Sequence, residues 1–292
     1  MKIAITGAGG FLGTELLRQL SGRADASVTA FTFDFERARN TFVTAPNIRN
    51  VDNADAGSYD FSDTDVLINC AFPRNVNDES FAGGLDFLQH VIEKAAANGV
   101  RAVINISSQS VYNQKRTEAA GEDAPIVLGS KYAVGKYFSE LFVNTVCRNI
   151  RHTNLRMASL IGAGFNQRIT NQFAMKICGG EQITLTGGNQ LFGFLDVRDA
   201  AAGILTVAFS EGEWDEVYNL GTNAAYSLLD IVNTAHSIGA AHGFIAPDPV
   251  VVGEGEWQNS AILCGRLYDR FGWKPSYTLQ DTVESIYQTL NP

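Results

Sequence analysis

Residues 2–20, "KIAITGAGGFLGTELLRQL", decide the fold of this chain. The stretch from Lys2 to Thr6 is rich in β-branched residues and predicts a strand. An amphipathic pattern from residue 11 onward predicts a helix. Four glycines lie in or beside the turn between them: Gly7, Gly9, Gly10 and Gly13. Such glycines allow a tight turn, close approach of the backbone to a pyrophosphate, and close packing of helix on sheet, so this stretch predicts a dinucleotide-binding turn.

Strands and helices alternate downstream of this turn. Apolar or β-branched runs predict strands at 27–33, 47–52, 65–72, 101–108 and 151–159. Helical patterns cover 83–98 and 131–147, and Gly99 ends the first of them. Alternation with nearly continuous apolar strands is the pattern of a doubly wound parallel α/β sheet, the Rossmann arrangement.

Composition and charge exclude several classes of protein. A net charge of −9 argues against nucleic acid, whose binding needs basic surface. No apolar run approaches the roughly 18 residues of a membrane span, and the first strand begins too close to Met1 for a signal peptide. The scattered cysteines suggest no metal site and are typical of a soluble, reduced cytoplasmic protein: Cys70, Cys147, Cys178 and Cys264.

A tyrosine and a lysine share one face of the helix predicted at 131–147. Tyr132 and Lys136 are four residues apart, and Ser107 and Ser108 end the preceding strand. In a parallel sheet both places border the ligand crevice. Hydride transfer between a carbonyl and an alcohol needs a proton donor or acceptor, and a free tyrosine has a pKa of about 10. A nearby ammonium lowers that pKa, so Ser108, Tyr132 and Lys136 are candidate catalytic residues.

The choice between NAD and NADP is open at this stage. A carboxylate at the end of the second strand binds a ribose hydroxyl and favours NAD, whereas arginine there favours NADP. The expected place holds Thr32, Asp34 follows slightly late, and Arg37 and Arg39 come next. Asp34 is either the ribose ligand or a solvated loop acid, and Asp52 is a candidate for the adenine end.

The chain resembles the extended short-chain dehydrogenase/reductase family, the NAD-dependent epimerase/dehydratase group. The matching pieces stand in family order over residues 3–274: "TGAGGFLG", "DVLINCAF", "NISSQSVY", "YAVGK", "LRMASLIGAG", "FLDVRDAA", "VYNLGT" and "FGWKP". The resemblance implies that Ser108, Tyr132 and Lys136 are the catalytic triad. The cofactor contacts implied beyond the glycines, Thr32, Asp34, Asp52 and the triad are Phe11, Leu12, Asn53, Cys70, Ala71, Phe72 and Ile106.

Departures from the family pattern bear on the reaction and the substrate. Family 4,6-dehydratases carry an Asp–Glu pair where this chain has Gln109 and Ser110, so the comparison argues against dehydration. Nucleotide-sugar enzymes of the family carry Asn where Ser159 stands and Arg where Phe192 stands, which weakens the case for a diphosphate-linked substrate. Arg74, Arg168 and Lys176 are alternative cations. The predicted substrate contacts are Arg74, Ser107, Ser108, Gln109, Ser159 and Phe192.

The resemblance also implies a domain organisation and an assembly. Residues 1–160 would form the NAD(P)-binding domain and 161–292 mainly a smaller substrate domain, with a strand near 217–221 returning to the first. Asp199 is expected to have a structural role near the start of a helix. Helices 83–98 and 131–147 would form a homodimer contact.

Three functions remain open from the sequence. The first is an NAD(P)-dependent epimerase or oxidoreductase acting on a sugar or nucleotide-sugar, with NAD the expected cofactor and NADP possible. The second is an NADP-dependent reductase of a non-nucleotide carbonyl compound. The third is a non-catalytic NAD(P)-binding sensor, which retention of Ser108, Tyr132 and Lys136 disfavours.

Overall fold

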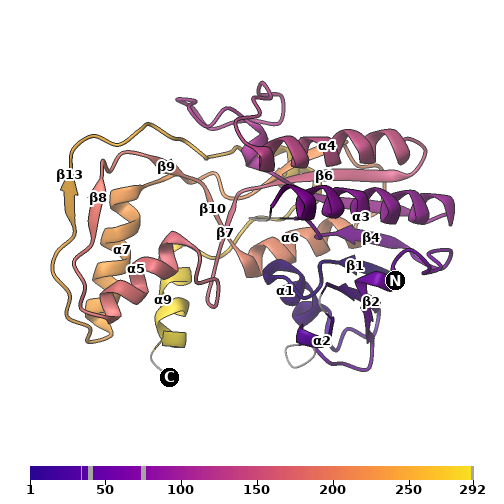
Figure 1. Ribbon diagram of the computed structural model, residues 1–292, viewed down its shortest axis with the longest axis horizontal. Coiled ribbons are helices and arrows are strands. Elements are labelled where there is room, and N and C mark those ends of the chain that lie inside the picture. Colours follow the sequence, from indigo (N-terminus) through magenta and orange to yellow (C-terminus); the bar gives the residue numbers. More distant parts are fainter. Residues whose placement is uncertain (34, 39–41, 74–76, 291–292) are drawn as a thin grey trace. The chain divides into compact units, whose positions relative to one another are not determined.

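The structure is a computed structural model that describes residues 1–33, 35–38, 42–73 and 77–290 (Figure 1). The chain divides into two compact units. The first unit comprises Met1–Val111, Leu128–Arg156 and Ala201–Tyr218. The second unit comprises Tyr112–Val127, Met157–Ala200 and Asn219–Pro292. Each unit therefore draws on segments that are far apart in the sequence.

A seven-stranded parallel sheet forms the centre of the first unit, in the order β11-β6-β5-β4-β1-β2-β3. Its strands are β1 (Lys2–Thr6), β2 (Ser27–Thr32), β3 (Ile48–Asp52), β4 (Val66–Asn69), β5 (Ala102–Ser108), β6 (Arg151–Met157) and β11 (Val217–Leu220). In the register of the central strands, Ile5 of β1 pairs with Ala30 of β2 on one side and with Ile68 of β4 on the other. The strand order reverses at β1, and in such sheets the ligand crevice lies at that reversal, beyond the carboxyl ends of the strands.

Helices cover both faces of this sheet (Figure 1). They are α1 (Phe11–Leu20), α2 (Phe35–Ala38), α3 (Asp78–Ala97), α4 (Lys131–Val146) and α6 (Val197–Phe209). Helices α3 and α4 share one core with the sheet, in which Leu88 and Ile92 of α3 pack with Val143 of α4 and Val103 of β5. Burial of these apolar side chains fixes α4 against the end of β5.

Within the described residues, four helices (α5, α7, α8 and α9) and three pairs of short strands lie in the second unit. The helices α5 (Ile169–Cys178), α7 (Leu228–Ala241) and α9 (Leu279–Leu290) pack around Ile177, Ile231 and Ile286, and α8 spans Gly265–Phe271. The strand pairs are β7 (Ser159–Ile161) with β10 (Phe194–Asp196), β9 (Leu191–Phe192) with β12 (Tyr226–Ser227), and β8 (Thr184–Thr186) with β13 (Val250–Val252).

The predicted fold class is confirmed, and the element ends need three corrections. The run 151–159 is two strands, since Ala158 separates β6 in the large sheet from β7, which pairs with β10. The helix predicted from residue 83 begins at Asp78, because the Asn77 side chain accepts a hydrogen bond from the Ser80 backbone and caps it there. The strand predicted at 65–72 ends at Asn69.

No helix within the described residues is long and apolar enough to cross a bilayer.

Candidate active site

The glycine-rich turn between β1 and α1 leaves no room for side chains. Gly7 has a φ of 67°, the left-handed region that side chains disfavour. A Cβ on Gly7 would lie 2.7 Å from the Ala71 nitrogen, and one on Gly13 would lie 2.3 Å from the Gly7 oxygen. The turn is thus pressed against the chain that leaves β4.

The N-terminus of α1 follows the glycine turn directly. The N-cap of α1 is Gly10, which has no side chain with which to cap the helix. The first turn of α1 contains no acidic residue. Phe11 is half-buried, and Leu12 is buried. The positive end of the helix dipole then acts on whatever lies beside Gly10, which suits a phosphate.

Thr32 ends β2 and lies against this turn. A Cβ on Gly9 would come within 2.6 Å of the Thr32 methyl group. The Thr32 hydroxyl is buried and has no hydrogen-bond partner among the described residues. Asp34, the predicted carboxylate, lies outside the described residues. No contact of the described chain therefore decides between NAD and NADP.

Asp52 and Asn53 mark the end of β3. The Asp52 carboxylate accepts a hydrogen bond from the Ala54 backbone at 2.9 Å and caps the short 3₁₀ turn η2 (Asn53–Asp55). The Asn53 side chain is buried. The structure thus gives Asp52 a capping contact, and its role toward adenine stays a prediction.

Cys70, Ala71 and Phe72 lead away from β4 toward the face of α4. The Ala71 nitrogen donates to the Thr6 hydroxyl at 3.3 Å. Burial raises the pKa of the Cys70 thiol to about 12, while the Lys136 ammonium acts in the opposite direction. Cys70 therefore stays protonated at neutral pH and is an unsuitable nucleophile. Its electrostatic coupling to Lys136 places the lysine charge near the end of β4.

Tyr132 and Lys136 lie on α4, which begins after the N-cap Ser130. Lys136 is buried, and its Nζ donates to the Ile106 carbonyl of β5 at 2.6 Å. The same Nζ lies 4.0 Å from the centre of the Phe72 ring and 5.9 Å from that of the Tyr132 ring. The helix spacing thus brings the ammonium beside the phenol, as the sequence predicts.

Phe72 packs against the side chains of both Tyr132 and Lys136. Its ring meets the Tyr132 ring edge-on, with centres 5.3 Å apart. Gly135 makes this packing possible, since a Cβ there would lie 2.6 Å from Phe81 and 3.0 Å from Phe72. The apolar ring keeps water from part of the lysine, which strengthens the effect of its charge nearby.

The serines at the end of β5 have different surroundings. The Ser108 hydroxyl is half-buried and accepts a hydrogen bond from the Ser110 backbone at 3.2 Å. The Ser107 hydroxyl is buried and donates to the Glu140 carboxylate of α4. Ser108 is therefore the more available of the two for a substrate oxygen, while Ser107 is engaged inside the unit.

Sequence reasoning missed two buried polar groups behind this face. Glu140 pairs with Arg156 of β6 through Nε–Oε1 at 3.0 Å and Nη2–Oε2 at 2.7 Å. In addition, Thr6, Asn69 and Asn105 are joined across three strands by hydrogen bonds of 2.6 and 2.9 Å. The available signals were Asn69 and Asn105 at corresponding positions of two apolar strands, and Glu140 one turn after Lys136.

The remaining predicted substrate residues are distributed over both units. Gln109 is buried in the 3₁₀ turn η3 (Gln109–Val111) after β5. Ser159 of β7 and Phe192 of β9 belong to the second unit, where the Phe192 ring stacks on Phe194 with centres 5.8 Å apart. Arg74 lies outside the described residues.

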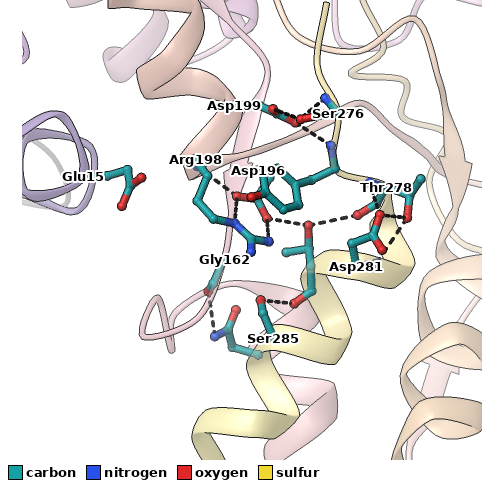
Figure 2. A network of polar contacts seen from close by, with 12 residues as sticks. Glu15, Gly162, Asp196, Arg198, Asp199, Ser276, Thr278, Asp281 and Ser285 are labelled. Carbon is teal, nitrogen blue, oxygen red and sulfur yellow. Dashed lines mark hydrogen bonds and ion pairs between the residues drawn. The ribbon is translucent and has the colours of Figure 1, made fainter. Parts of the chain in front are cut away.

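A second polar network ties the end of the chain to the start of α6 (Figure 2). The Asp199 carboxylate accepts hydrogen bonds from the Ser276 nitrogen and hydroxyl, each at 3.0 Å, and from the Tyr277 nitrogen at 2.8 Å. The Asp196 carboxylate pairs with Arg198 at 2.7 Å and accepts from the Thr282 hydroxyl of α9. Asp199 therefore has the structural role that the sequence suggested.

The described ranges contain no group of three or more His, Cys, Asp and Glu side chains that could hold a metal ion. The features of the first unit are compatible with a dinucleotide. Backbone at Gly7 and Gly13, the α1 N-terminus and an unpartnered hydroxyl at Thr32 fit a nicotinamide dinucleotide.

Comparisons with known proteins agree with this geometry. The model of the NAD dependent epimerase/dehydratase family matches residues 3–221. The low-salt glycan biosynthesis protein Agl12 of Haloferax volcanii is 26% identical over 98% of this chain and 97% of its own length. A dTDP-glucose 4,6-dehydratase of Streptomyces griseus is 25% identical over 96% of this chain and 90% of its own.

A crystal structure of UDP-glucuronic acid 4-epimerase from Bacillus cereus, in complex with UDP-glucuronic acid and NAD, superposes with a TM-score of 0.84. It is 21% identical in sequence and covers 99% of this chain and 98% of its own. The likeness establishes a shared fold.

Proposed function

The chain belongs to the NAD dependent epimerase/dehydratase family, and from that premise we propose that it is an NAD-dependent epimerase of a nucleotide-linked sugar. The observation that carries the proposal is the cluster of Tyr132, Lys136 and the Ile106 carbonyl beside Phe72. The glycine turn and the α1 N-terminus supply the adjoining dinucleotide site. Several relatives and structural neighbours are UDP-sugar 4-epimerases, which supports the same class of substrate.

NAD is the proposed cofactor, and it would be held by the chain around the first turn. Gly7, Gly9, Gly10 and Gly13 would let the backbone approach the pyrophosphate, with Thr32 and Asp52 toward the adenosine half. When bound, the nicotinamide supplies the acceptor and donor of hydride for oxidation and reduction at one sugar carbon. The crystal structure of the Bacillus cereus UDP-glucuronic acid 4-epimerase contains NAD.

Tyr132 is proposed to move the proton at the sugar hydroxyl. As phenolate it would accept the hydroxyl proton during oxidation, and as phenol it would return the proton during reduction. The Lys136 ammonium, 5.9 Å from the Tyr132 ring, favours the phenolate. The Ser108 hydroxyl would hydrogen-bond the same substrate oxygen and orient it. Inversion at the carbon then requires only that the oxidised sugar present its other face before it is reduced.

We propose epimerisation and not dehydration because of the residues after Ser108. Gln109 and Ser110 occupy η3, where family dehydratases carry two acids, and neither side chain is an acid that can expel water. A dTDP-glucose 4,6-dehydratase is among the relatives at 25% identity. Mass analysis of a dTDP-glucose incubation decides the point: formation of a product lighter by one water contradicts this part of the proposal.

Phe192 favours a second candidate function. In family nucleotide-sugar enzymes a cationic Arg stands there, whereas here an aromatic ring stacks on Phe194. Without that cation a diphosphate loses a charge-assisted donor, and an uncharged carbonyl compound loses nothing. The alternative is an NADP-dependent reductase of such a compound.

A homodimer is also proposed, through α3 and α4. Val134 and Leu141 are seven residues apart on α4 and are 49% and 51% exposed, so one stripe of the helix presents apolar side chains. The mass of one chain is 31.6 kDa. Light scattering is expected to give about twice this mass, whereas a stable mass equal to one chain would contradict the dimer.

A substrate panel tests the proposed reaction. The purified protein is incubated with UDP-glucose, UDP-N-acetylglucosamine and UDP-glucuronic acid in turn, without added cofactor, and the sugars are analysed by proton NMR. The proposal expects conversion of at least one sugar to its 4-epimer, up to an equilibrium mixture. Reduction of a simple carbonyl compound only on addition of NADPH, with every UDP-sugar unchanged, would favour the alternative.

A further inference from the structure

Two side chains of α4, Lys136 and Glu140, contact two consecutive residues of β5, Ile106 and Ser107. Tyr132, Lys136 and Glu140 are spaced by four residues and therefore share one face of the helix. On the strand side, the Ile106 carbonyl accepts from Lys136, and the Ser107 hydroxyl donates to Glu140. The face that carries the candidate reactive pair thus continues, one turn further, into a buried carboxylate.

That carboxylate lies where it could neutralise the lysine. In a helix, a Lys and a Glu four residues apart are neighbours whose charges attract each other. The attraction is strong in this place, since Lys136 and Glu140 are 5% and 3% exposed and water screens their charges little. A Glu140 charge directed at Lys136 would weaken the field that the ammonium exerts on Tyr132.

Arg156 of β6 pairs with this carboxylate. Its side chain is 8% exposed, and its guanidinium takes both oxygens of Glu140, with Nε–Oε1 at 3.0 Å and Nη2–Oε2 at 2.7 Å. Two parallel hydrogen bonds of this kind fix the orientation of a carboxylate as well as its charge. Ser107 adds a third donor from β5.

We propose that Arg156 is a positioning residue that holds and neutralises Glu140, so that the charge of Lys136 acts on Tyr132. The inference rests on the proposed function for its biological meaning. Its physical content is that Arg156 and Glu140 have opposite effects on the ionisation of Tyr132, although neither touches a substrate.

Other ionisable groups near this face do not alter the expected effect of Arg156 and Glu140 on the ionisation of Tyr132. Cys70 lies behind Lys136, and its thiol stays protonated because burial raises its pKa to about 12. Asp78 of α3 pairs with Lys131 at the start of α4, at 2.7 Å, and both are exposed. Arg156 and Glu140, in contrast, are buried, so solvent screens their charges little. Removing either charge should therefore change the field at Tyr132.

A pH titration of tyrosinate absorbance tests the proposal without a substrate. The spectrum of each variant is compared with that of the same variant carrying Tyr132→Phe, and the difference isolates Tyr132. Tyr132 is eight residues from Glu140, about 12 Å along the helix axis. At that separation a buried unit charge is expected to move the midpoint by about half to one pH unit.

The signs of the expected shifts are specific. Glu140→Gln removes a negative charge and is expected to lower the midpoint, because Arg156 then adds to the field of Lys136. Arg156→Met leaves Glu140 unneutralised and is expected to raise it. The double variant Glu140→Gln/Arg156→Met is expected to return near the wild-type value. Arg156→Lys keeps the charge and is expected to leave the midpoint close to wild type.

A matched control lies on the same strand. Arg151 of β6 donates to the Ser210 and Gly212 carbonyls and packs over Trp214, and Arg151→Met is expected to leave the midpoint unchanged. A lone buried carboxylate destabilises a fold. If Arg156→Met does not fold, Glu140→Gln and the double variant carry the test. Shifts of the same sign in Glu140→Gln and Arg156→Met, or no shift in Glu140→Gln, would overturn the proposal.

This outcome is separable from the proposed function. If no UDP-sugar turns over but the midpoints move with the stated signs, the proposed function fails and the positioning role stands. If turnover is found and the midpoints stay fixed, the proposed function stands and the positioning role fails.

Discussion

Two polar networks, one in each unit, are each centred on a buried carboxylate, but the partners of the two carboxylates differ. In the second unit, the Asp199 carboxylate is taken up by donors from Ser276 and Tyr277, and it joins two segments of chain (Figure 2). In the first unit, Glu140, one helical turn after Lys136 on α4, binds a guanidinium and a hydroxyl. The Asp199 carboxylate joins two segments of chain, whereas the Glu140 carboxylate, in our proposal, controls the charge that acts on Tyr132.

The largest effect is expected at Lys136, beside the Glu140–Arg156 pair of the first unit. Lys136→Met is expected to lower kcat about a thousandfold, since the phenolate loses its stabilising ammonium. The thermal midpoint is expected to change little, because an apolar chain of similar volume replaces a buried charge. Steady-state kinetics and thermal unfolding measure both.

Lys131→Met is the matched control for this substitution. Lys131 lies on the same helix but is exposed and pairs with Asp78. A surface pair of this kind contributes about 1 kcal/mol at most, so kcat is expected to stay within about twofold of wild type. An equal loss of kcat in both variants would remove Lys136 from its proposed role.

The glycine turn gives the next largest effect. Gly7→Ala is expected to weaken cofactor binding about tenfold or more, because a Cβ would lie 2.7 Å from the Ala71 nitrogen at a φ of 67°. Gly22→Ala has a similar φ of 80° with nothing within 4 Å, so it should cost about 1–2 kcal/mol of stability and leave binding intact. Titration calorimetry with NAD compares the two, and equal affinities would contradict the account of the turn.

A smaller effect on activity, but a clear one on stability, is expected in the second unit. Asp199→Ala leaves the donors of Ser276 and Tyr277 without their acceptor and should lower the free energy of unfolding by about 3 kcal/mol. Denaturant unfolding measures this loss. If kcat of the folded variant falls as far as in Lys136→Met, the two networks do not differ in the way described above.

The smallest effect concerns two helix caps in the second unit. Hydrogen bonds from Ser227 lower the pKa of Asp230, and hydrogen bonds from Thr278 lower the pKa of Asp281. A lowered folded-state pKa stabilises the fold above the unfolded value, near 3.9, and that stabilisation is lost as pH falls through the folded value. The double variant Asp230→Asn/Asp281→Asn is therefore expected to lose less stability than wild type between pH 5 and pH 3, as urea unfolding at each pH would show. An identical loss would contradict it.

The sequence predicted the Tyr132–Lys136 face of the first unit but not the network of Glu140, Arg156 and Ser107 beside it. Apolar strands and the glycine turn are local signals, so the parallel sheet and the Tyr132–Lys136 face could be read from periodicity and spacing. The contacts of Glu140 with Ser107 and Arg156 join three separate elements, and no local pattern shows which buried charge finds which partner. For the same reason Ser107 was grouped with Ser108, although its hydroxyl donates to Glu140.

The second unit was less predictable for a related reason. Its strands have two or three residues, too few for a clear alternation, and its order comes from contacts such as Asp196 with Thr282 across 86 residues. Ala158 illustrates the limit: one apolar run, "LRMASLI", supplies strands to two different sheets. Tertiary pairing, not local propensity, ends β6 there.

The most direct measurement of the central claim compares Tyr132→Phe with Tyr137→Phe, a half-buried tyrosine of the same helix. NAD released on denaturation and 4-epimer formation from the active UDP-sugar are quantified in the same preparations. The account predicts that both variants retain NAD at about one per chain, and that epimer formation is lost in Tyr132→Phe alone. Epimer formation at the wild-type rate by Tyr132→Phe would contradict it.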